Sequence, residues 1–302
     1  MRLDQLYRSG KIEISIEFFP PKTPEGVEKL FGETIPALNR LGPAYFSMTF
    51  GAGGTTRDLT IELCDRMKNQ TKVETVCHLN IVGQSKSDTQ ENLARIKAAG
   101  VYNLLALRGD PPRDQTHEIS SAISRVQPDF KPRPYGFHSS VELIEEARKD
   151  PWFSIAVTGF PEVHPEAKDR AADMAYLKRK LDAGGCVIIT QFFLECAAFF
   201  EFMDLVKKAG ITAPVVPGIL PILSASQVRR FASLCSSTIP PDVEKELSQV
   251  ENDEEGALRY GIELATRMCG ELLKSGVPGL HFYALNRSRS TVEILSNLGL
   301  AP

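Results

Sequence analysis

The stretch Ile12-Glu-Ile-Ser-Ile-Glu-Phe18 is a short run rich in β-branched residues, and such a run predicts a β-strand. The segment Pro24–Leu41 follows it and has the apolar spacing of an amphipathic helix. This strand-then-helix unit recurs along the whole chain. The expected strands are Ile12–Phe18, Ala44–Thr49, Val73–His78, Val101–Leu107, Phe153–Thr158, Val187–Phe192, Pro214–Gly218 and Leu280–Leu285. Alternating units form parallel βαβ structure, and eight of them predict a (β/α)8 TIM barrel.

The segments between these strands have helical patterns, and several of them end at a glycine, as at Ala99-Gly100 and Ala183-Gly184. A glycine just past a helix commonly forms the left-handed cap that turns the chain toward the next strand. The expected helices are Pro24–Leu41, Arg57–Asn69, Asp88–Ala99, Val141–Lys149, Lys168–Ala183, Ala197–Lys208, Ala225–Cys235, Glu254–Lys274 and Arg289–Leu298.

Two segments do not fit the repeating unit. Asp110–Ser140 is a long, proline-containing insertion after the fourth strand, and Ser236–Asp253 precedes the eighth helix. Long loops in a compact domain are commonly functional, and the first insertion lies on the active-site face of the expected barrel. We therefore expect it to form part of the binding site or its lid.

The composition indicates one domain that acts on small molecules. The chain has 302 residues, 42% hydrophobic and 24% charged, with a net charge of −3. This charge gives no basic footprint for nucleic acid or for an anionic membrane surface. No signal peptide and no membrane-spanning stretch is expected, and six scattered cysteines without a C-x-x-C pair or a zinc spacing indicate a reduced cytoplasmic protein without a metal site.

Residues able to do chemistry follow nearly every expected strand. In a TIM barrel the active site forms at the carboxyl ends of the strands, so their position alone makes them candidates. They are Glu17, Thr49, His78, Arg108, Asp110, Phe160, Gln191, Asn286 and Arg287. The glycine-rich loop Gly51–Thr56 lacks the dinucleotide-binding pattern, and either a flexible loop or a phosphate cradle fits it.

Four of these motifs predict particular roles. Glu17 precedes two aromatics and two prolines, and an apolar wall of that kind is expected to raise its pKa and keep it protonated. Arg108-Gly109-Asp110 combines a diphosphate partner, a close backbone approach and an acceptor for a heterocycle. His164 precedes a helix start, which is a potential anion site. Gln191 has a donor and an acceptor for a pyrimidine-like ring, whereas Lys180 is expected on a solvated helix face.

Taken together, the motifs resemble the 5,10-methylenetetrahydrofolate reductase family. Each block alone is weak, but eight of them occur in the expected order from the first strand to the last. The blocks are Ile16–Lys22, Ser47–Gly51, Cys77–Leu79, Ala106–Pro111, Pro161–Ala167, Ile189–Phe193, Val216–Ile219 and His281–Arg287.

The resemblance implies a non-covalent FAD at the carboxyl face of the barrel, reduced by NADH or NADPH as co-substrate. It implies that Glu17 is the general acid and that Asp110 is an acid near flavin and pterin. It places the folate near Gln191, Gln227, Phe231 and Arg287. The cofactor-binding residues that it implies are Thr49, His78, Arg108, Gly109, Asp110, Ser140, Phe160, His164, Glu166, Ala167, Asp173 and Lys180.

Two departures from the family pattern affect the expected flavin contacts. Phe160 stands where the family tends to have tyrosine, and Ser139-Ser140 stand where it tends to have Tyr-Ala beside the adenine or ribose. The chain is also expected to be a single catalytic barrel without the regulatory domain of eukaryotic members, and therefore without control by S-adenosylmethionine. Homo-oligomers are expected because the family tends to form them.

The implied reaction is the reduction of 5,10-methylenetetrahydrofolate to 5-methyltetrahydrofolate, a step toward methionine biosynthesis. A protonated Glu17 would help to open the carbon–nitrogen bond at nitrogen 10, and reduced flavin would supply hydride in ping-pong turnover. Two alternative enzymes are a cofactor-free barrel lyase and a pterin-binding methyltransferase. A barrel that has lost its activity would be a third alternative, but Glu17 and Asp110 are both present.

Overall fold

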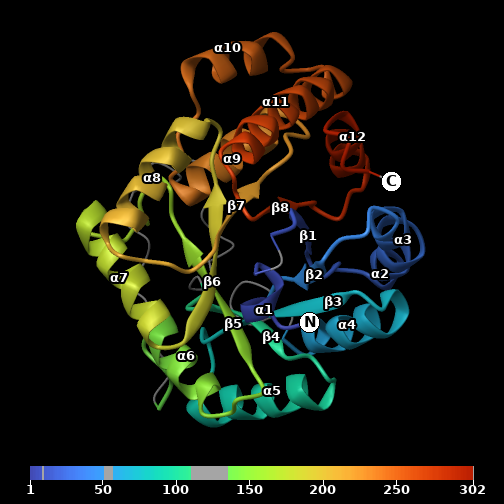
Figure 1. Ribbon diagram of the computed structural model, residues 1–302. Coiled ribbons are helices and arrows are strands. Elements are labelled where there is room, and N and C mark those ends of the chain that lie inside the picture. The colour runs from blue at the N-terminus through green and yellow to red at the C-terminus, as the bar shows by residue number, and fades with distance from the viewer. Residues whose placement is uncertain (9, 51–56, 110–134, 302) are drawn as a thin grey trace.

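The computed structural model describes residues 1–8, 10–50, 57–109 and 135–301. Its centre is a closed barrel of parallel strands in the order β1 to β8 (Figure 1). The strands are β1 (Glu13–Phe18), β2 (Tyr45–Met48), β3 (Glu74–Asn80), β4 (Asn103–Leu107), β5 (Ser154–Gly159), β6 (Gly185–Phe192), β7 (Val215–Ile219) and β8 (Gly279–Tyr283). The predicted barrel and each of its expected strands are confirmed.

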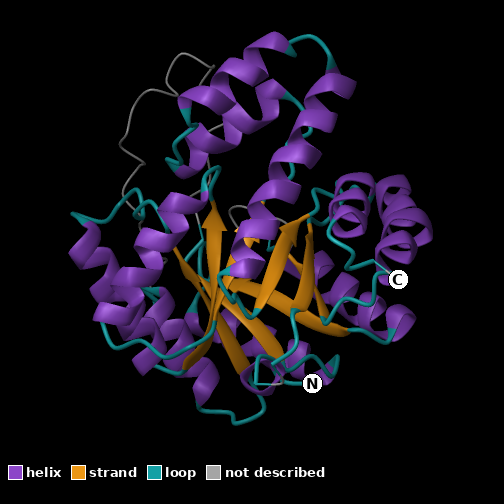
Figure 2. Ribbon diagram, turned by 45° about the horizontal axis from the view of Figure 1, so that its top comes forward, coloured by secondary structure: helices purple, strands orange, loops and turns teal. Residues whose placement is uncertain are grey.

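Helices surround these strands (Figure 2). They are α1 (Leu3–Leu6), α2 (Pro24–Lys29), α3 (Ile35–Asn39), α4 (Arg57–Thr71), α5 (Lys86–Ala98), α6 (Ser140–Arg148), α7 (Arg170–Asp182), α8 (Cys196–Lys208), α9 (Ala225–Cys235), α10 (Pro241–Gln249), α11 (Glu254–Lys274) and α12 (Arg289–Asn297). In the part of the chain that the structure describes, no helix is both long and apolar enough to cross a bilayer.

The expected helix Pro24–Leu41 is interrupted by a π-helical turn, η1 (Leu30–Thr34). Proline has no backbone N–H, so Pro36 removes one hydrogen bond that a continuous α-helix would need. The N–H of Ile35 reaches back five residues to the carbonyl of Leu30, which is the π-helical pattern. The expected helical segment is therefore confirmed, with a π-helical turn in its middle.

Two structural elements were not expected from the sequence. The short helix α1 packs Leu3 and Leu6 into an apolar cluster with Tyr45 and other residues that line the barrel interior. The insertion before α11 contains α10, which begins with Pro241 at its first turn, a position that tolerates proline. The first insertion, by contrast, lies largely outside the described residues.

Alternation along β1 decides which of its side chains enter the barrel. Ile14, Ile16 and Phe18 belong to the large apolar core that the helices cover. Successive side chains of a strand point to opposite faces, so Ser15 and Glu17 face the barrel interior. Both are buried there although they are polar, so each side chain needs a hydrogen-bonding partner.

A pair of hydrogen bonds joins the segment just past β1 to the segment just past β8. Asn286, just past β8, accepts from the N–H of Phe19 at 2.9 Å and donates to the carbonyl of Phe19 at 2.8 Å. Leu285 and Asn286 both have left-handed backbones, with φ of 51° and 56°. Such conformations are rare for L-residues, and asparagine adopts them more readily than most. We call this pair of hydrogen bonds the Asn286 clamp.

Candidate active site

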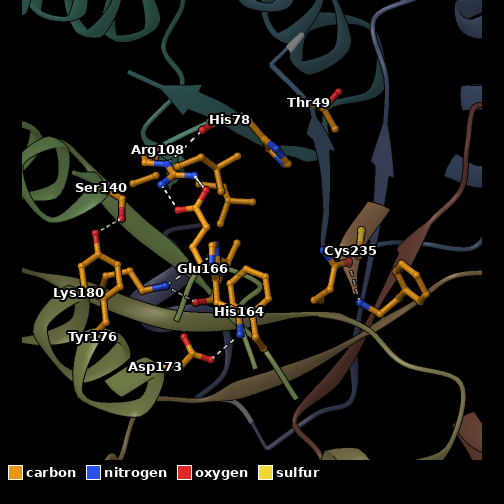
Figure 3. Close-up of a pocket in the computed structure, with 18 of the residues that line it drawn as sticks. Thr49, His78, Arg108, Ser140, His164, Glu166, Asp173, Tyr176, Lys180 and Cys235 are labelled. Atoms are coloured by element: carbon orange, nitrogen blue, oxygen red, sulfur yellow. Dashed lines mark hydrogen bonds and ion pairs between the residues drawn. The ribbon is translucent and has the colours of Figure 1, made fainter. Parts of the chain in front are cut away.

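A cavity of about 760 Å³ opens at the carboxyl ends of the strands (Figure 3). Its size is typical of small-molecule sites. It gathers fourteen of the residues expected from the sequence: Glu17, Thr49, His78, Arg108, Gly109, Ser140, Phe160, His164, Glu166, Ala167, Asp173, Lys180, Gln191 and Phe231. Asp110, the second expected acid, lies outside the described residues.

Two of the expected substrate-binding residues do not line this cavity. Gln227 and Arg287 line a neighbouring hollow of about 970 Å³, and Leu285 is common to both linings. The Oε1 atom of Gln227 accepts from the N–H of Leu223 at 2.8 Å, and its Nε2 atom is buried without a partner among the described residues. These two predicted residues therefore lie beside the main cavity and not in its lining.

Glu17 lies between two histidines from neighbouring strands. Its Oε2 atom is 3.2 Å from Nε2 of His281 and 3.3 Å from Nε2 of His78. Burial by itself raises the pKa of Glu17, but the charge of His78 and the hydrogen bond from His281 outweigh it and lower the pKa to about 2. The expectation of a protonated Glu17 is thus wrong for the protein without a ligand. Phe18 points to the opposite face of the sheet and forms no wall against the carboxylate.

His281 connects Glu17 to Ser15, and the sequence analysis missed it. Its Nδ1 atom lies 2.8 Å from the hydroxyl of Ser15, and both side chains are fully buried. The Ser15 hydroxyl donates to the carbonyl of Leu280 at 3.3 Å, so it accepts the N–H of Nδ1, and Nε2 of His281 faces Glu17. The register pairs Ser15 directly with His281. The period of two along β1 and β8 was the signal that could have found this triad.

His78 has hydrogen-bonding capacity that the described residues do not use. Its Nε2 atom is buried and close to Glu17, yet it makes no hydrogen bond of good geometry among those residues. Buried polar atoms of this kind usually have a partner, so a ligand is the natural candidate. His78 is only 3% exposed and lines the cavity, so a small group within the cavity can reach it.

Glycine is required at position 109. Gly109 has φ of +86°, and a side-chain carbon there would lie 2.9 Å from atoms of Asn80 and Val82. The preceding residue, Arg108, forms two hydrogen bonds with the carboxylate of Glu166, one of them of 2.7 Å between Nη2 and Oε1. The hydrogen bond from Arg108 lowers the pKa of Glu166. Glu166 therefore holds the guanidinium in place at the cavity wall.

Lys180 is buried at the cavity, contrary to the expected solvated position. It is 5% exposed, and its Nζ atom donates to the carbonyl of Thr158 at 2.5 Å. Burial lowers its pKa to about 8, although Asp173 nearby acts in the opposite direction. Asp173 and Lys180 are seven residues apart, which places both on the same face of α7. That face is the inner one.

His164 adds a further polar group beside this lysine. Its backbone N–H donates to Asp173 at 3.0 Å, and its Nδ1 atom accepts from the N–H of Glu166 at 3.1 Å. The proton of the neutral ring therefore lies on Nε2. The ring contacts Phe160 edge-on at 4.6 Å, and burial lowers the pKa of His164. Its neighbour Val163 has φ of 88°, a strained conformation for a β-branched residue.

Gln191 is positioned by its own backbone. Its Oε1 atom accepts from the N–H of Phe192 at 3.0 Å, so its amino group is the part able to donate to a ligand. Phe231 of α9 lines the same cavity and is half-buried. Across the described ranges no group of three or more His, Cys, Asp or Glu side chains is arranged to hold a metal ion.

Comparison with known proteins decides the family. The model of the methylenetetrahydrofolate reductase family matches residues 2–299. The chain belongs to this family. The predicted resemblance is therefore confirmed.

Similar methylenetetrahydrofolate reductases occur in plants and bacteria. Methylenetetrahydrofolate reductase (NADH) 1 of Zea mays is 39% identical over 96% of this chain and 49% of its own length. The 5,10-methylenetetrahydrofolate reductase of Escherichia coli is 33% identical over 97% of this chain and 93% of its own length. The chain thus spans about half the length of the plant relatives and nearly all of the bacterial one.

A solved structure shares the reductase barrel fold at low sequence identity. It is that of an uncharacterized protein from Clostridium thermocellum that binds two copies of 5-methyl-5,6,7,8-tetrahydrofolic acid. The two chains superpose with a TM-score of 0.66 at 15% identity, over 99% of this chain and 97% of that one. This likeness shows the fold alone.

Proposed function

We propose that this protein reduces 5,10-methylenetetrahydrofolate to 5-methyltetrahydrofolate, with FAD bound non-covalently in the cavity and NADH or NADPH as electron donor. The observation that carries the proposal is the buried Glu17, which hydrogen-bonds His281 in the same cavity as Lys180 and Arg108. The cavity thus has a carboxyl group able to exchange a proton and a separate group of cations able to hold an anion.

The residues at the cavity fit a flavin dinucleotide. Lys180 and Arg108 provide positive charge for a diphosphate, and arginine suits bidentate binding of phosphate. The Nε2 atom of His78, which makes no well-aligned hydrogen bond among the described residues, is a partner for a polar ring edge. The absence of a side chain at Gly109 lets a flat group lie close to the backbone. When bound, FAD supplies hydride, because no side chain is a two-electron donor.

Glu17 holds the proton that opens the substrate. The bridging carbon of the substrate is bonded to two nitrogens, and protonation at nitrogen 10 would open one of these bonds. In the ligand-free protein Glu17 is anionic, so the proton must reach its Oε2 atom from a neighbour. A His281 protonated on both ring nitrogens would pass its Nε2 proton along the 3.2 Å hydrogen bond to that atom and become neutral, keeping the proton on Nδ1. Folate that covers the carboxylate would exclude water and favour its protonated form.

The remaining expected residues orient the folate. The amino group of Gln191 and the ring of Phe231 would contact the pterin end, where a planar heterocycle needs in-plane donors and an apolar surface. Gln227 and Arg287 line the adjoining hollow, where Arg287 would attract the carboxylates of the glutamate tail. Asp110 is proposed as the acceptor near pterin and flavin, on the family resemblance alone.

We also propose a cellular compartment, partners and an assembly for this protein. All six cysteines are free thiols, which supports a reducing compartment, and we propose the cytoplasm. Small molecules are the proposed partners, and a homo-oligomer is the proposed assembly.

Anaerobic spectroscopy tests the function directly. The purified protein, supplied with FAD, should bind about one FAD per chain and show the visible absorbance band of an oxidised flavin. NADH or NADPH should bleach this band, and methylenetetrahydrofolate should restore it. A protein that takes up no FAD, or whose reduced flavin is not reoxidised by the folate, would contradict the proposal. Menadione, a quinone with no carbon–nitrogen bond to open, serves as a control electron acceptor, and its reduction should not depend on Glu17.

A further inference from the structure

Three helices begin at the hollow beside the main cavity. Helix α12 lies next to α11 there (Figure 1). The amino end of a helix has unpaired backbone N–H groups and a partial positive charge, so it needs a cap or an anion. The lining of the hollow includes Ser224 and Gln227 at the start of α9, Glu254 and Glu255 at the start of α11, and Ser288, Arg289 and Ser290 at the start of α12.

Two of these helix ends are satisfied by their own side chains, and the third is not. The hydroxyl of Ser224 caps α9 at 3.2 Å, and the carboxylate of Asp253 caps α11 at 2.9 Å. At α12, Ser288 makes no capping hydrogen bond, and the first turn contains no acidic residue. The N–H of Val292 reaches the carbonyl of Ser288 at 3.0 Å, so the N–H groups of the three residues before Val292 are available to a ligand.

Two side chains in the same lining point to a ligand independently of the helix end. Ser290 is 3% exposed, and its hydroxyl has no hydrogen-bond partner among the described residues. The Nε2 atom of Gln227 is buried and, within the same described ranges, also lacks a partner. Buried polar atoms usually have one. A hydroxyl and an amino group from two helices are thus left to bind something in the hollow.

The hydrogen-bonding capacity of these groups identifies the kind of ligand. The backbone N–H groups of α12, the amino group of Gln227 and the guanidinium of Arg287 can only donate, and the hydroxyl of Ser290 can donate one hydrogen bond. A set of donors fits a ligand that only accepts hydrogen bonds. Such a ligand is an oxyanion, and a carboxylate is the example that folate provides.

Acidic side chains in the lining do not prevent the binding of an oxyanion at α12. Glu255 is paired with Arg289, with 2.6 Å between Oε1 and Nη2. Glu33 and Glu254 are exposed, and water and salt weaken the repulsion between exposed charges. Ser290 is buried, so a hydrogen bond from its hydroxyl forms where water is excluded. The oxyanion is therefore expected at Ser290 and not beside the exposed carboxylates.

We propose that the amino end of α12, with Ser290 and Gln227, is an oxyanion site that binds one carboxylate of the folate tail while Arg287 binds the other. The inference rests on the proposed function, which places the glutamate tail in this hollow. A glutamate has two carboxylates, and one guanidinium can bind one of them in a bidentate manner. The hollow has about 970 Å³ and adjoins the main cavity at Leu285, so a tail that enters from the pterin end meets both groups.

The test compares 5-methyltetrahydrofolate with the corresponding pteroate, which lacks the glutamate and both of its carboxylates. Isothermal titration calorimetry of the FAD-loaded protein gives the two dissociation constants. Ser288→Asp adds a capping carboxylate to α12, so the melting temperature should stay the same or rise. The same carboxylate occupies the N–H groups and repels the ligand. Folate should therefore bind about tenfold or more weakly, as for a lost hydrogen bond to a charged group, whereas pteroate binding should stay unchanged.

Ser290→Ala is the second variant, and it adds no charge. It removes the buried hydroxyl at nearly constant volume and should also weaken folate binding by about tenfold, without an effect on pteroate. Ser85→Asp is the matched control, because Ser85 caps α5 and lines neither the main cavity nor the hollow. It places the same charge at a helix start and should change neither affinity. Thermal melting of each protein verifies that the variants fold.

Three outcomes would overturn this inference and leave the proposed function in place. The first is an equal loss of folate and pteroate affinity in Ser288→Asp and Ser290→Ala, which would indicate a general disturbance of the site. The second is parental folate affinity in both variants. The third is a parent protein that binds pteroate as tightly as folate, because the tail would then make no contact. A parent that binds neither compound would contradict the proposed function as well.

Discussion

The two sides of the cavity are built differently. The acid side, Glu17 with His78 and His281, consists of strand residues inside the barrel, and their partners also come from strands. The cationic side, Arg108 with His164 and Lys180, is held by α7 and by residues just past β4 and β5. Strand residues are fixed by the sheet register, whereas residues in loops and on helices are fixed by individual side-chain contacts.

The partners on the two sides differ as well. On the acid side the carboxylate of Glu17 has two imidazoles within 3.3 Å, at 3.2 Å and 3.3 Å. On the cationic side Glu166 is bound by Arg108, but Lys180 is buried with a carbonyl as its closest partner. Burial of a cation without an adjacent anion costs stability. One side is thus arranged to exchange a proton, and the other to receive a negative ligand.

The largest effect is expected at the acid side. Glu17→Gln should slow folate reduction about 10²- to 10⁴-fold, the usual contribution of a general acid, because a side-chain amide is too weak an acid to transfer a proton. Reduction of FAD by the nicotinamide should remain nearly intact. Stopped-flow spectroscopy of the two half-reactions measures both rates. Glu13→Gln, at the amino end of the same strand, is the control and should change neither. Equal losses in both half-reactions would assign Glu17 a structural role.

The second prediction concerns Lys180 and pH. Its folded-state pKa is lowered to about 8, from 10.5, so between these pH values the unfolded chain binds more protons than the folded one. Stability of the apoprotein should therefore rise with pH in this window, relative to Lys180→Met. The difference should approach about 3 kcal/mol, at roughly 1.4 kcal/mol per pKa unit. Urea unfolding at several pH values between 7 and 10.5 measures it.

A matched lysine on the same helix is the control for this effect. Lys178 is exposed and pairs with Asp182 at 3.1 Å, so Lys178→Met should show no such dependence on pH. A flat difference for Lys180→Met would mean that water reaches its ammonium group. The cationic side of the cavity would then no longer differ from the acid side by a destabilising buried charge.

The third prediction concerns Gln191 and the binding of folate. Gln191→Ala should weaken folate binding by about 1–3 kcal/mol, because polar atoms of the pterin would lose a partner. FAD content should be unchanged, and it is checked before each titration. Gln90→Ala, an exposed residue on α5, is the control. Unchanged folate affinity in Gln191→Ala would remove β6 from substrate recognition.

The smallest effect is expected at the Asn286 clamp. Asn286→Ala removes two hydrogen bonds to Phe19 and should cost about 1 kcal/mol of stability, since both bonds are exposed to water. Asn297→Ala, at the end of α12, is the control and should cost less. Chemical denaturation of the three proteins gives the comparison. No loss in Asn286→Ala would show that strand pairing alone closes the barrel at this point.

The barrel could be predicted from the sequence because its signals are local and repeated. Apolar runs such as Val101–Leu107 and glycines such as Gly100 recur in each unit, and a mistake in one unit does not change the architecture. The elements that were missed depend on tertiary contacts. Helix α1 is four residues long and exists because Leu3 and Leu6 pack into the amino end of the barrel. No local pattern in so short a segment predicts it.

The positions of the site residues were predictable, but their electrostatic states were not. Strand ends placed Glu17, His78 and Gln191 in one cavity, as expected. The pKa of Glu17 depends instead on His78 and His281, which are both distant in sequence, so the apolar neighbours in sequence gave the wrong direction. The burial of Lys180 likewise follows from which face of α7 meets the barrel. Such facts require knowledge of what packs against each side chain.

The pairing of β1 with β8 has a consequence for the order of folding. Glu17 and His281 are separated by 264 positions in sequence, and the Asn286 clamp joins residues 267 positions apart. During synthesis the first strand leaves the ribosome long before its last neighbour exists. Until β8 arrives, the carboxylate of Glu17 lacks one of the two imidazoles that stabilise its charge, that of His281. Glu17 and His281 are therefore brought together only when β8 closes the sheet. A chain stalled before that step lacks the proposed proton donor to Glu17.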